Sequence, residues 1–312
     1  MSAVYRRRES GAAMIIVFWL VALLSLVIFT TVRVVKNDTD IMISQKKAFR
    51  ATQLAEMGIA IGTNPVTKET DFALLNQRIS DDESFEVRLK GEGGKFNINS
   101  ILQQQDRDLL LHMFTEWGLE QEEVDSLIDA LIDWVDADEQ ELLNGAEFEY
   151  YEELGFLNYP FNRPFYSVDE MRLVRGMEMV ILLKPNWKDF FTIYSGGRLD
   201  LNEANAEAIS LATKADIEDA QELVETRWGA DGIEDTEDDE AAKLSSLGQA
   251  MAILGLTPDT EIFLNQRLTL NDATVRIESV GTIGDFRKKI VVVVRNRNNR
   301  PEILTREEIP LF

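Results

Sequence analysis

The amino-acid sequence predicts an α+β fold in which a long N-terminal helix packs on a small antiparallel sheet, and a large all-α domain is inserted in that sheet. Three observations predict it. The chain opens with an uninterrupted apolar run, and two segments that alternate apolar and polar side chains stand far apart. The roughly 170 residues between those segments repeat their apolar side chains at helical spacing.

The N-terminal apolar run is long enough to cross a membrane. Residues 11–32 contain no charged side chain and follow directly on Arg6, Arg7, Arg8 and Glu9. A helix of this length spans a bilayer core of about 30 Å at about 1.5 Å per residue, and the arginines mark the cytoplasmic end. No small-residue cleavage site follows the run, and neither Gly nor Pro occurs from residue 12 to Gly58. We therefore expect one helix that crosses the membrane and continues to about residue 61.

Composition and charge limit the possible functions. The 312 residues include no Cys, which excludes disulfides, thiolate metal sites and thiol catalysis. Residues 1–50 hold eight Lys and Arg against three Asp and Glu, so the remainder is five units more negative than the net charge of −23. Such a field repels nucleic acid and favours divalent cations or basic partners. We predict no nucleic-acid partner.

Two β-hairpins are predicted, one on each side of the helical region. Residues 84–90 alternate apolar and polar side chains, residues 91–94 supply Gly for a turn, and residues 95–99 alternate again. Near the C-terminus, residues 274–281 and 286–295 have the same pattern around a Gly-containing turn.

The region between the hairpins has helical signals. Apolar residues recur at helical spacing from Leu109 to Val135, after an N-cap signal at Asn99-Ser100. A loop of aromatic and Pro-rich sequence follows at residues 150–166. Ser167 with Glu170 then forms a capping-box pattern that predicts the next helix.

Two acidic clusters have the composition of a calcium site, because this hard cation takes six to eight oxygen ligands. The first surrounds a Gly turn and lacks the EF-hand spacing. Its candidate ligands are Asp231, Asp235, Asp238 and Asp239. In the second, two carboxylates share a helix face and two fold back from the following loop. Its candidate ligands are Asp133, Asp136, Asp138 and Glu147. Each cluster is either a calcium site or a solvated acidic loop.

Catalysis has little support in the sequence. His112 is the single histidine and stands in an apolar helix, where a structural role is the simpler interpretation. Zinc sites and Ser-His-Asp triads need more than that one residue. We predict that the protein is not an enzyme.

The junction before the apolar run resembles the leader of type IV pilins and of the pseudopilins of type II secretion. The resemblance implies that a prepilin peptidase cuts between Gly11 and Ala12 and that Ala12 is then N-methylated. Pilin-like proteins nearly all carry Glu as the fifth mature residue. Here that position is Ile16.

The chain as a whole resembles the minor pseudopilin K family of type II secretion, which is known for lacking that glutamate. The resemblance rests on the leader and on residues 94–99, 131–138, 165–177 and 199–202. It implies a cleaved leader (1–11), a transmembrane and assembly helix (12–62), a pilin-like sheet domain (63–100 and 271–312) and an inserted helical domain (101–270). The first acidic cluster also resembles the calcium loop of the major pseudopilin, and calcium is expected from the K family as well.

The resemblance implies a subunit that forms or caps the tip of the periplasmic pseudopilus with minor pseudopilins I and J, in support of the export of folded proteins across the outer membrane. Further implied partners are the major pseudopilin filament, the prepilin peptidase and the inner-membrane secretion platform. The chain is expected to cross the bacterial inner membrane once, with its N-terminus cytoplasmic and its C-terminal domain periplasmic. The alternative is a single-pass membrane-anchored periplasmic adaptor or enzyme with no pilin-type processing.

Overall fold

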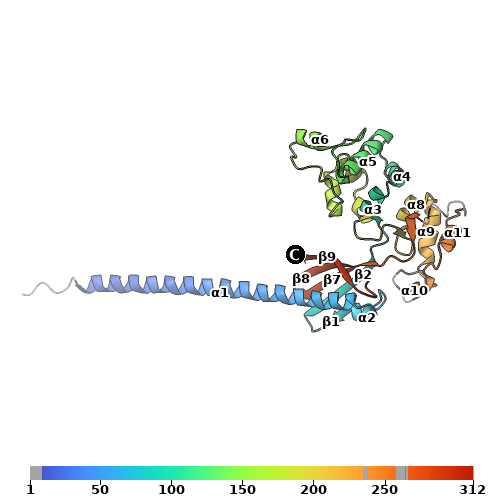
Figure 1. Ribbon diagram of the computed structural model, residues 1–312. Helices are drawn as coiled ribbons and strands as arrows, with labels where there is room; N and C mark the ends of the chain where they lie inside the picture. The colour runs from blue at the N-terminus through green and yellow to red at the C-terminus, as the bar shows by residue number, and fades with distance from the viewer. Residues whose placement is uncertain (1–8, 235, 237, 258–263, 265, 312) are drawn as a thin grey trace, which may run out of the picture.

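One long helix joins a globular part at its C-terminal end (Figure 1). The computed structural model describes residues 9–234, 236, 238–257, 264 and 266–311. The helix, α1, extends over Glu9–Thr63. Its N-terminal part projects away from the rest of the chain, and its last turns lie against the sheet. The predicted continuation of the membrane helix is therefore confirmed, and the helix passes through Gly58 without a break.

The main sheet is antiparallel and contains strands from both ends of the chain. Its order is β1-β2-β7-β8-β9, and the short helix α2 (Phe72–Leu75) precedes it. The strands are β1 (Asn76–Arg78), β2 (Glu83–Gly91), β7 (Thr274–Ile283), β8 (Phe286–Arg295) and β9 (Glu302–Leu311). The predicted C-terminal hairpin is confirmed, because β7 and β8 pair from Thr274↔Arg295 to Ile283↔Phe286.

The predicted N-terminal hairpin is wrong. Strand β2 pairs with β1 and β7, whereas β3 (Phe96–Asn97) pairs in parallel with β4 (Phe191–Thr192). The glycines between β2 and β3 allow a close approach and do not reverse the chain. A Cβ atom on Gly94 would lie 2.6 Å from the backbone carbonyl carbon of Glu203. Phe96 is then free to enter the helical core, where its side chain is buried.

The insertion between β2 and β7 is built from short helices around a separate apolar core (Figure 1). Among the described residues, its α-helices include α3 (Ile98–Gln103), α4 (Arg107–Glu116), α5 (Gln121–Val135), α6 (Phe148–Glu153), α7 (Met177–Leu183), α8 (Ala206–Thr213), α9 (Ile217–Thr226), α10 (Asp239–Ala242) and α11 (Leu247–Ile253). Two 3₁₀ helices, η1 (Val168–Leu173) and η2 (Trp187–Phe190), and the parallel pair of β5 (Leu199–Asp200) with β6 (Leu268–Thr269) complete it.

The capping box predicted at Ser167 does not form. The side chain of Ser167 caps no backbone N–H, and the residues after it adopt the tighter 3₁₀ helix η1. Glu170 is occupied elsewhere, because its carboxylate accepts hydrogen bonds at 3.0 Å from Arg163 and from the indole N–H of Trp134. A stronger charge-assisted contact thus replaces the local cap.

Glycines bring α1 unusually close to the sheet. A Cβ atom on Gly58 would lie 2.7 Å from Val87 Cγ2 and closer still to Ser279 Oγ. On the sheet side, a Cβ atom on Gly281 would overlap the backbone of α1 at Ala51. Leu54 and Ala55 of α1 are fully buried in this contact. The interface therefore depends on backbone-to-backbone proximity that larger residues would prevent.

We predict that Gly58→Ala separates α1 from β7. The added methyl group overlaps the side chains of Ser279 and Val87, and overpacking of this kind costs about 1–3 kcal/mol. Hydrogen exchange of the full-length chain in detergent should show lost protection over residues 274–283. Gly248→Ala is the matched control, because no atom lies within 4 Å of its Cβ position in α11. Unchanged exchange in Gly58→Ala would contradict this account of the interface.

Candidate functional site

The exposed part of α1 is strongly apolar. Every side chain over residues 13–46 is exposed, and the window of highest mean hydropathy reaches 2.8. By length and composition this helix is able to cross a membrane. Arg33 and Lys36 follow the apolar run. Such a stretch needs lipid or other helices around it, since water is a poor solvent for it.

The predicted processing site lies at the start of α1. The backbone of Gly11 and Ala12 is helical, because α1 begins at Glu9. Ile16 lies one turn further on, and 66% of its side chain is exposed. Ile16 belongs to the part of α1 that projects away from the rest of the described chain, so its role depends on what surrounds that part of the helix.

Three of the four carboxylates predicted for the first acidic cluster come together. One carboxylate oxygen from each of Asp231, Asp238 and Asp239 lies within 4.8 Å of the others. The fourth, Asp235, lies outside the described residues. Thr236 Oγ1 is a shared neighbour, at 2.9 Å from Asp238 Oδ1 and 3.2 Å from Asp239 Oδ1.

Backbone amides shape this loop around Asp238. Its Oδ2 accepts hydrogen bonds from the N–H groups of Ala230 at 2.6 Å and Asp231 at 3.3 Å. The hydrogen bond from Thr236, followed by those amides, lowers the pKa of the half-buried Asp238 carboxyl. Gly229 and Gly232 supply the positive φ angles of the turn. The loop thus holds three carboxylates close together.

The second acidic cluster is far less exposed. Asp133 is fully buried and Glu147 is 5% exposed, whereas Asp138 lies at the surface. Asp133 Oδ2 accepts hydrogen bonds from the N–H groups of Ala146 at 2.9 Å and Leu142 at 3.3 Å. Both carboxylate oxygens of Glu147 and Oδ1 of Asp136 are buried with no hydrogen-bond partner among the described residues. Buried oxygens of this kind are rare without a compensating ligand.

The electrostatics of this cluster penalise ionisation. Burial raises the pKa of Glu147 to about 7, with further contributions from the negative charges of Asp133, Asp136 and Asp138. Burial also raises the pKa of Asp133 to about 6, although two backbone N–H groups oppose the shift. The charges of Asp133 and Glu147 therefore need either protons or a cation to balance them.

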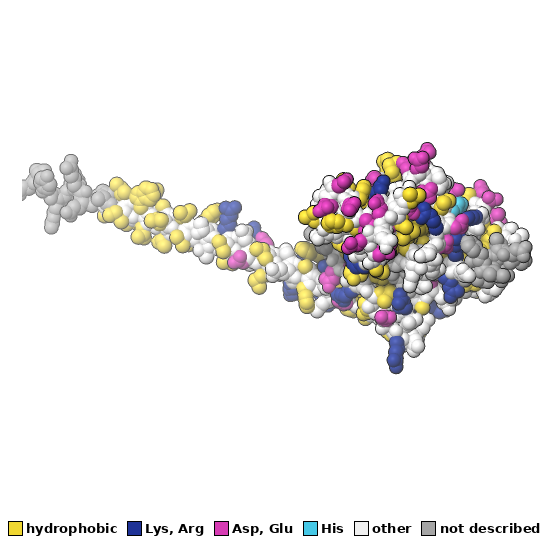
Figure 2. Space-filling view, turned by 45° about the horizontal axis from the view of Figure 1, so that its top comes forward, with side chains coloured by type: hydrophobic (Ala, Val, Ile, Leu, Met, Phe, Trp, Pro, Cys, Tyr) yellow, Lys and Arg dark blue, Asp and Glu magenta, His cyan; other side chains and the backbone are white. Residues whose placement is uncertain are grey.

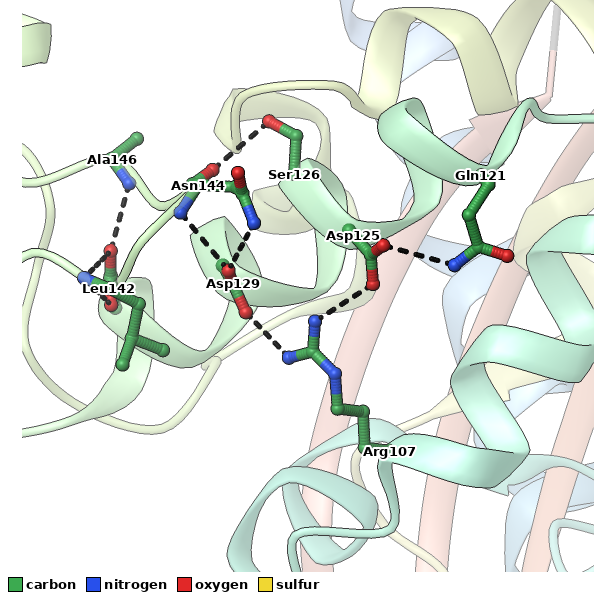
Figure 3. Close-up of polar contacts among 9 residues, drawn as sticks. Arg107, Gln121, Asp125, Ser126, Asp129, Leu142, Asn144 and Ala146 are labelled. Atoms are coloured by element: carbon green, nitrogen blue, oxygen red, sulfur yellow. Dashed lines mark hydrogen bonds and ion pairs between the residues drawn. The ribbon is translucent and has the colours of Figure 1, made fainter.

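Sequence reasoning missed the carboxylates that hold the second cluster in place. Arg107 Nη1 lies 2.5 Å from Asp129 Oδ1, and its Nη2 lies 3.1 Å from Asp125 Oδ1 (Figure 3). Asp129 Oδ2 accepts hydrogen bonds from the backbone N–H and the side-chain amide of Asn144, each at 3.2 Å. The available signal was the spacing of residues 125, 129 and 133, which places three carboxylates on one face of α5.

The loop that covers the cluster requires glycine at position 145. A Cβ atom on Gly145 would overlap the carboxylate of Asp133, so only Gly fits there. The carbonyl of Gly145 accepts a hydrogen bond from Arg175 Nη1 at 2.7 Å, and the carbonyl of Asn144 accepts one from Ser126 (Figure 3). The loop therefore presents its amides to Asp133 and leaves Glu147 facing the same interior.

Comparison with known proteins shows which proteins this chain is similar to. A family model for protein K of the type II secretion system matches residues 94–184. The type II secretion system protein K of Pseudomonas aeruginosa is 24% identical over 249 residues, which cover 74% of this chain and 66% of that relative. The protein of the same description from Klebsiella pneumoniae is 36% identical over 97 residues, 28% of this chain and 29% of the relative. The chain is therefore similar to protein K of the type II secretion system over a large part of its length.

The fold agrees with this assignment. The crystal structure of the GspK–GspI–GspJ complex from the type 2 secretion system of enterotoxigenic Escherichia coli contains a chain with the same fold, at a TM-score of 0.61 and 15% identity. The match covers 89% of this chain and 99% of that one. A long apolar helix, an antiparallel sheet and a helical insertion are thus shared with that chain, and this is the fold that the sequence predicted.

We predict that the two raised pKa values make the stability of the metal-free protein pH-dependent. Folding favours the protonated carboxyls, so their contribution is complete below the unfolded pKa of about 4. It is lost as the pH rises through about 6 for Asp133 and about 7 for Glu147. The melting temperature in EDTA should fall as the pH rises from about 5 to about 8, and the melting temperature of Glu147→Gln should fall less over the same range. Glu149→Gln, at an exposed neighbour, serves as the control. An identical profile for wild type and Glu147→Gln would contradict the assignment.

Proposed function

We propose that this protein is a minor pseudopilin that forms or caps the tip of the periplasmic pseudopilus with minor pseudopilins I and J, and so supports the export of folded proteins across the outer membrane. One observation carries the proposal. The helix α1 exposes its apolar side chains over residues 13–46 while its last turns are fixed to the sheet, in a fold matched by a complex that contains GspI and GspJ. A helix of this kind is built to pack with other helices, first in the membrane and then in a filament.

The position of the insertion supports a place at the filament end. The sheet and the helical insertion both lie at the C-terminal end of α1, opposite its apolar end (Figure 1). If α1 packs in parallel with neighbouring helices, the insertion occupies space beyond their last turns. Another subunit stacked above it would meet this bulk, so a terminal position fits the shape.

Ile16 supports the same position. The glutamate of pilin-like proteins is thought to pair with the N-terminal amine of a neighbouring subunit, and an unpaired carboxylate in apolar surroundings costs several kcal/mol. A terminal subunit has no neighbour above it to present that amine. An apolar residue at position 16 avoids the cost.

We also propose how the chain is oriented in the membrane and how its leader is processed. Arg6, Arg7 and Arg8 keep the N-terminus cytoplasmic, so the sheet and the insertion lie in the periplasm. A prepilin peptidase then cuts after Gly11 and methylates Ala12. We infer no catalytic role, and the further partners are the major pseudopilin filament and the inner-membrane secretion platform.

We predict that the chain, expressed with I, J and the prepilin peptidase, co-purifies with I and J and starts at N-methylated Ala12. Affinity purification through J followed by intact-mass spectrometry measures both results. Gly11→Leu should keep Met1, because the peptidase no longer finds its leader. A wild-type chain that retains Met1 and leaves I and J behind would instead support a membrane-anchored periplasmic adaptor or enzyme.

We also propose that the two acidic clusters bind calcium. The donors are all oxygens, as a hard cation requires, and the two clusters differ in how deeply those oxygens are buried. Asp231, Asp238 and Asp239 converge in an exposed loop, whereas Glu147 and Asp136 offer buried oxygens that have no hydrogen-bond partner among the described residues. Asp133 adds a third buried carboxylate. A bound cation would neutralise the repulsion in each cluster and lower the pKa of Glu147.

We predict that EDTA lowers the melting temperature of the purified protein and that calcium restores it, since a ligand that binds only the folded state stabilises it. Glu147→Gln and Asp238→Asn should each reduce the bound calcium measured by elemental analysis. Asp169→Asn, which alters an exposed carboxylate outside both clusters, should leave it unchanged. An EDTA-insensitive melting curve with no bound metal would refute both sites.

A further inference from the structure

The segment from α6 to Tyr166 exposes more apolar surface than a folded domain normally leaves in water. Leu154 is 57% exposed, Phe156 50%, Leu157 65% and Tyr166 71%. Figure 2 shows hydrophobic side chains lying among acidic ones over the helical part of the molecule. Single exposed apolar residues are ordinary, but a cluster within one short segment indicates a contact surface.

These exposed side chains rest on a rigid aromatic base. Trp134 is fully buried, and its ring centroid lies 5.2 Å from that of Tyr159 and 5.4 Å from that of Phe161. Phe156 stacks on Tyr159 at 5.3 Å, and the guanidinium of Arg163 lies 3.6 Å from the ring centroid of Tyr166. The outward rings are thus held in place before any partner arrives, which lowers the entropy cost of binding.

Negative charge predominates around these side chains, although Arg163 lies over the rings of Phe161 and Tyr166, and Arg175 lies over the ring of Tyr150. Residues 108–162 contain no Lys or Arg. The exposed carboxylates of Glu149, Glu152 and Glu153 lie on α6 itself. Arg163 lies 3.0 Å from Glu170 and is neutralised by it. A partner must therefore bring positive charge to this surface.

We propose that this apolar–acidic surface docks a polypeptide partner that presents apolar side chains flanked by Lys or Arg. The surface consists of Leu154, Phe156, Leu157, Phe161 and Tyr166 beside Glu152 and Glu153. Apolar burial supplies the affinity, while the carboxylates select the charge and speed the encounter. Anionic lipid and nucleic acid are repelled by the same carboxylates. The surface belongs to the insertion and contains no residue of α1, so this inference does not rest on the assembly of I and J.

Short synthetic peptides test the proposal on the full-length chain in phosphatidylcholine nanodiscs with calcium present. Three fluorescein-labelled hexapeptides are compared, in which Lys alternates with Leu or Phe, Glu alternates with Leu or Phe, and Lys alternates with Ser. Fluorescence anisotropy, corrected with empty nanodiscs, should show binding of the first peptide at least about tenfold tighter than of the others. Equal binding of the Lys–Ser peptide would overturn the proposal, because charge alone would then explain it. Absence of binding by the Lys–apolar peptide would also overturn it.

Variants locate the contact. The double variant Leu154→Ser, Leu157→Ser should bind the Lys–apolar peptide about tenfold more weakly than the wild type. The double variant Glu152→Lys, Glu153→Lys should show the same loss of affinity. Leu182→Ser is the control, since Leu182 is 70% exposed in α7 and outside the surface. All these side chains are exposed, so melting temperatures should stay unchanged. Wild-type affinity in both double variants would overturn the proposal.

Discussion

The close packing of α1 on the sheet is the contact on which the rest of the structure depends. Gly58 in α1 and Gly281 in β7 remove the side chains that would hold the two backbones apart, and Leu54 fills the space between them. This contact fixes one end of a helix whose N-terminal part projects away from the rest of the described chain. The apolar end of α1 is therefore joined to the globular part through the sheet.

A second joint fixes the insertion to the sheet by polar contacts. The carboxylate of Glu92, which is 2% exposed, accepts a hydrogen bond from Arg276 of β7 at 2.9 Å. It accepts a second from the hydroxyl of Thr192 in the insertion at 3.0 Å. The arginine lowers the pKa of the Glu92 carboxyl despite the burial, so the pair stays ionised at neutral pH. Breaking such a pair leaves a buried charge, which costs about 3–5 kcal/mol. The angle between insertion and sheet is therefore set by directional contacts.

Local patterns in the sequence predicted most of the fold, and non-local pairing explains the errors. The apolar run and the β7–β8 hairpin are encoded by adjacent residues, so periodicity was sufficient. Phe96 was assigned to a hairpin because its true partner, Phe191 in β4, stands almost a hundred residues away. In the second acidic cluster the candidate ligands were recognisable, but their support by Asp129 and Arg107 requires two helices to meet. Exposure of Leu154 and Leu157 has no sequence signal, since burial depends on the whole core.

The pairing of β2 with β7 has a consequence for how the molecule is made. These neighbouring strands are separated by the entire insertion, so topologically the insertion is a very long loop between two strands. Closing a loop costs entropy that grows slowly with its length, and a loop that has already folded brings its own ends together. In synthesis from the N-terminus, α1 is made first and β9 last. The apolar helix is consequently complete while its sheet is still open, and the last strands to be synthesised complete the surface on which α1 is held.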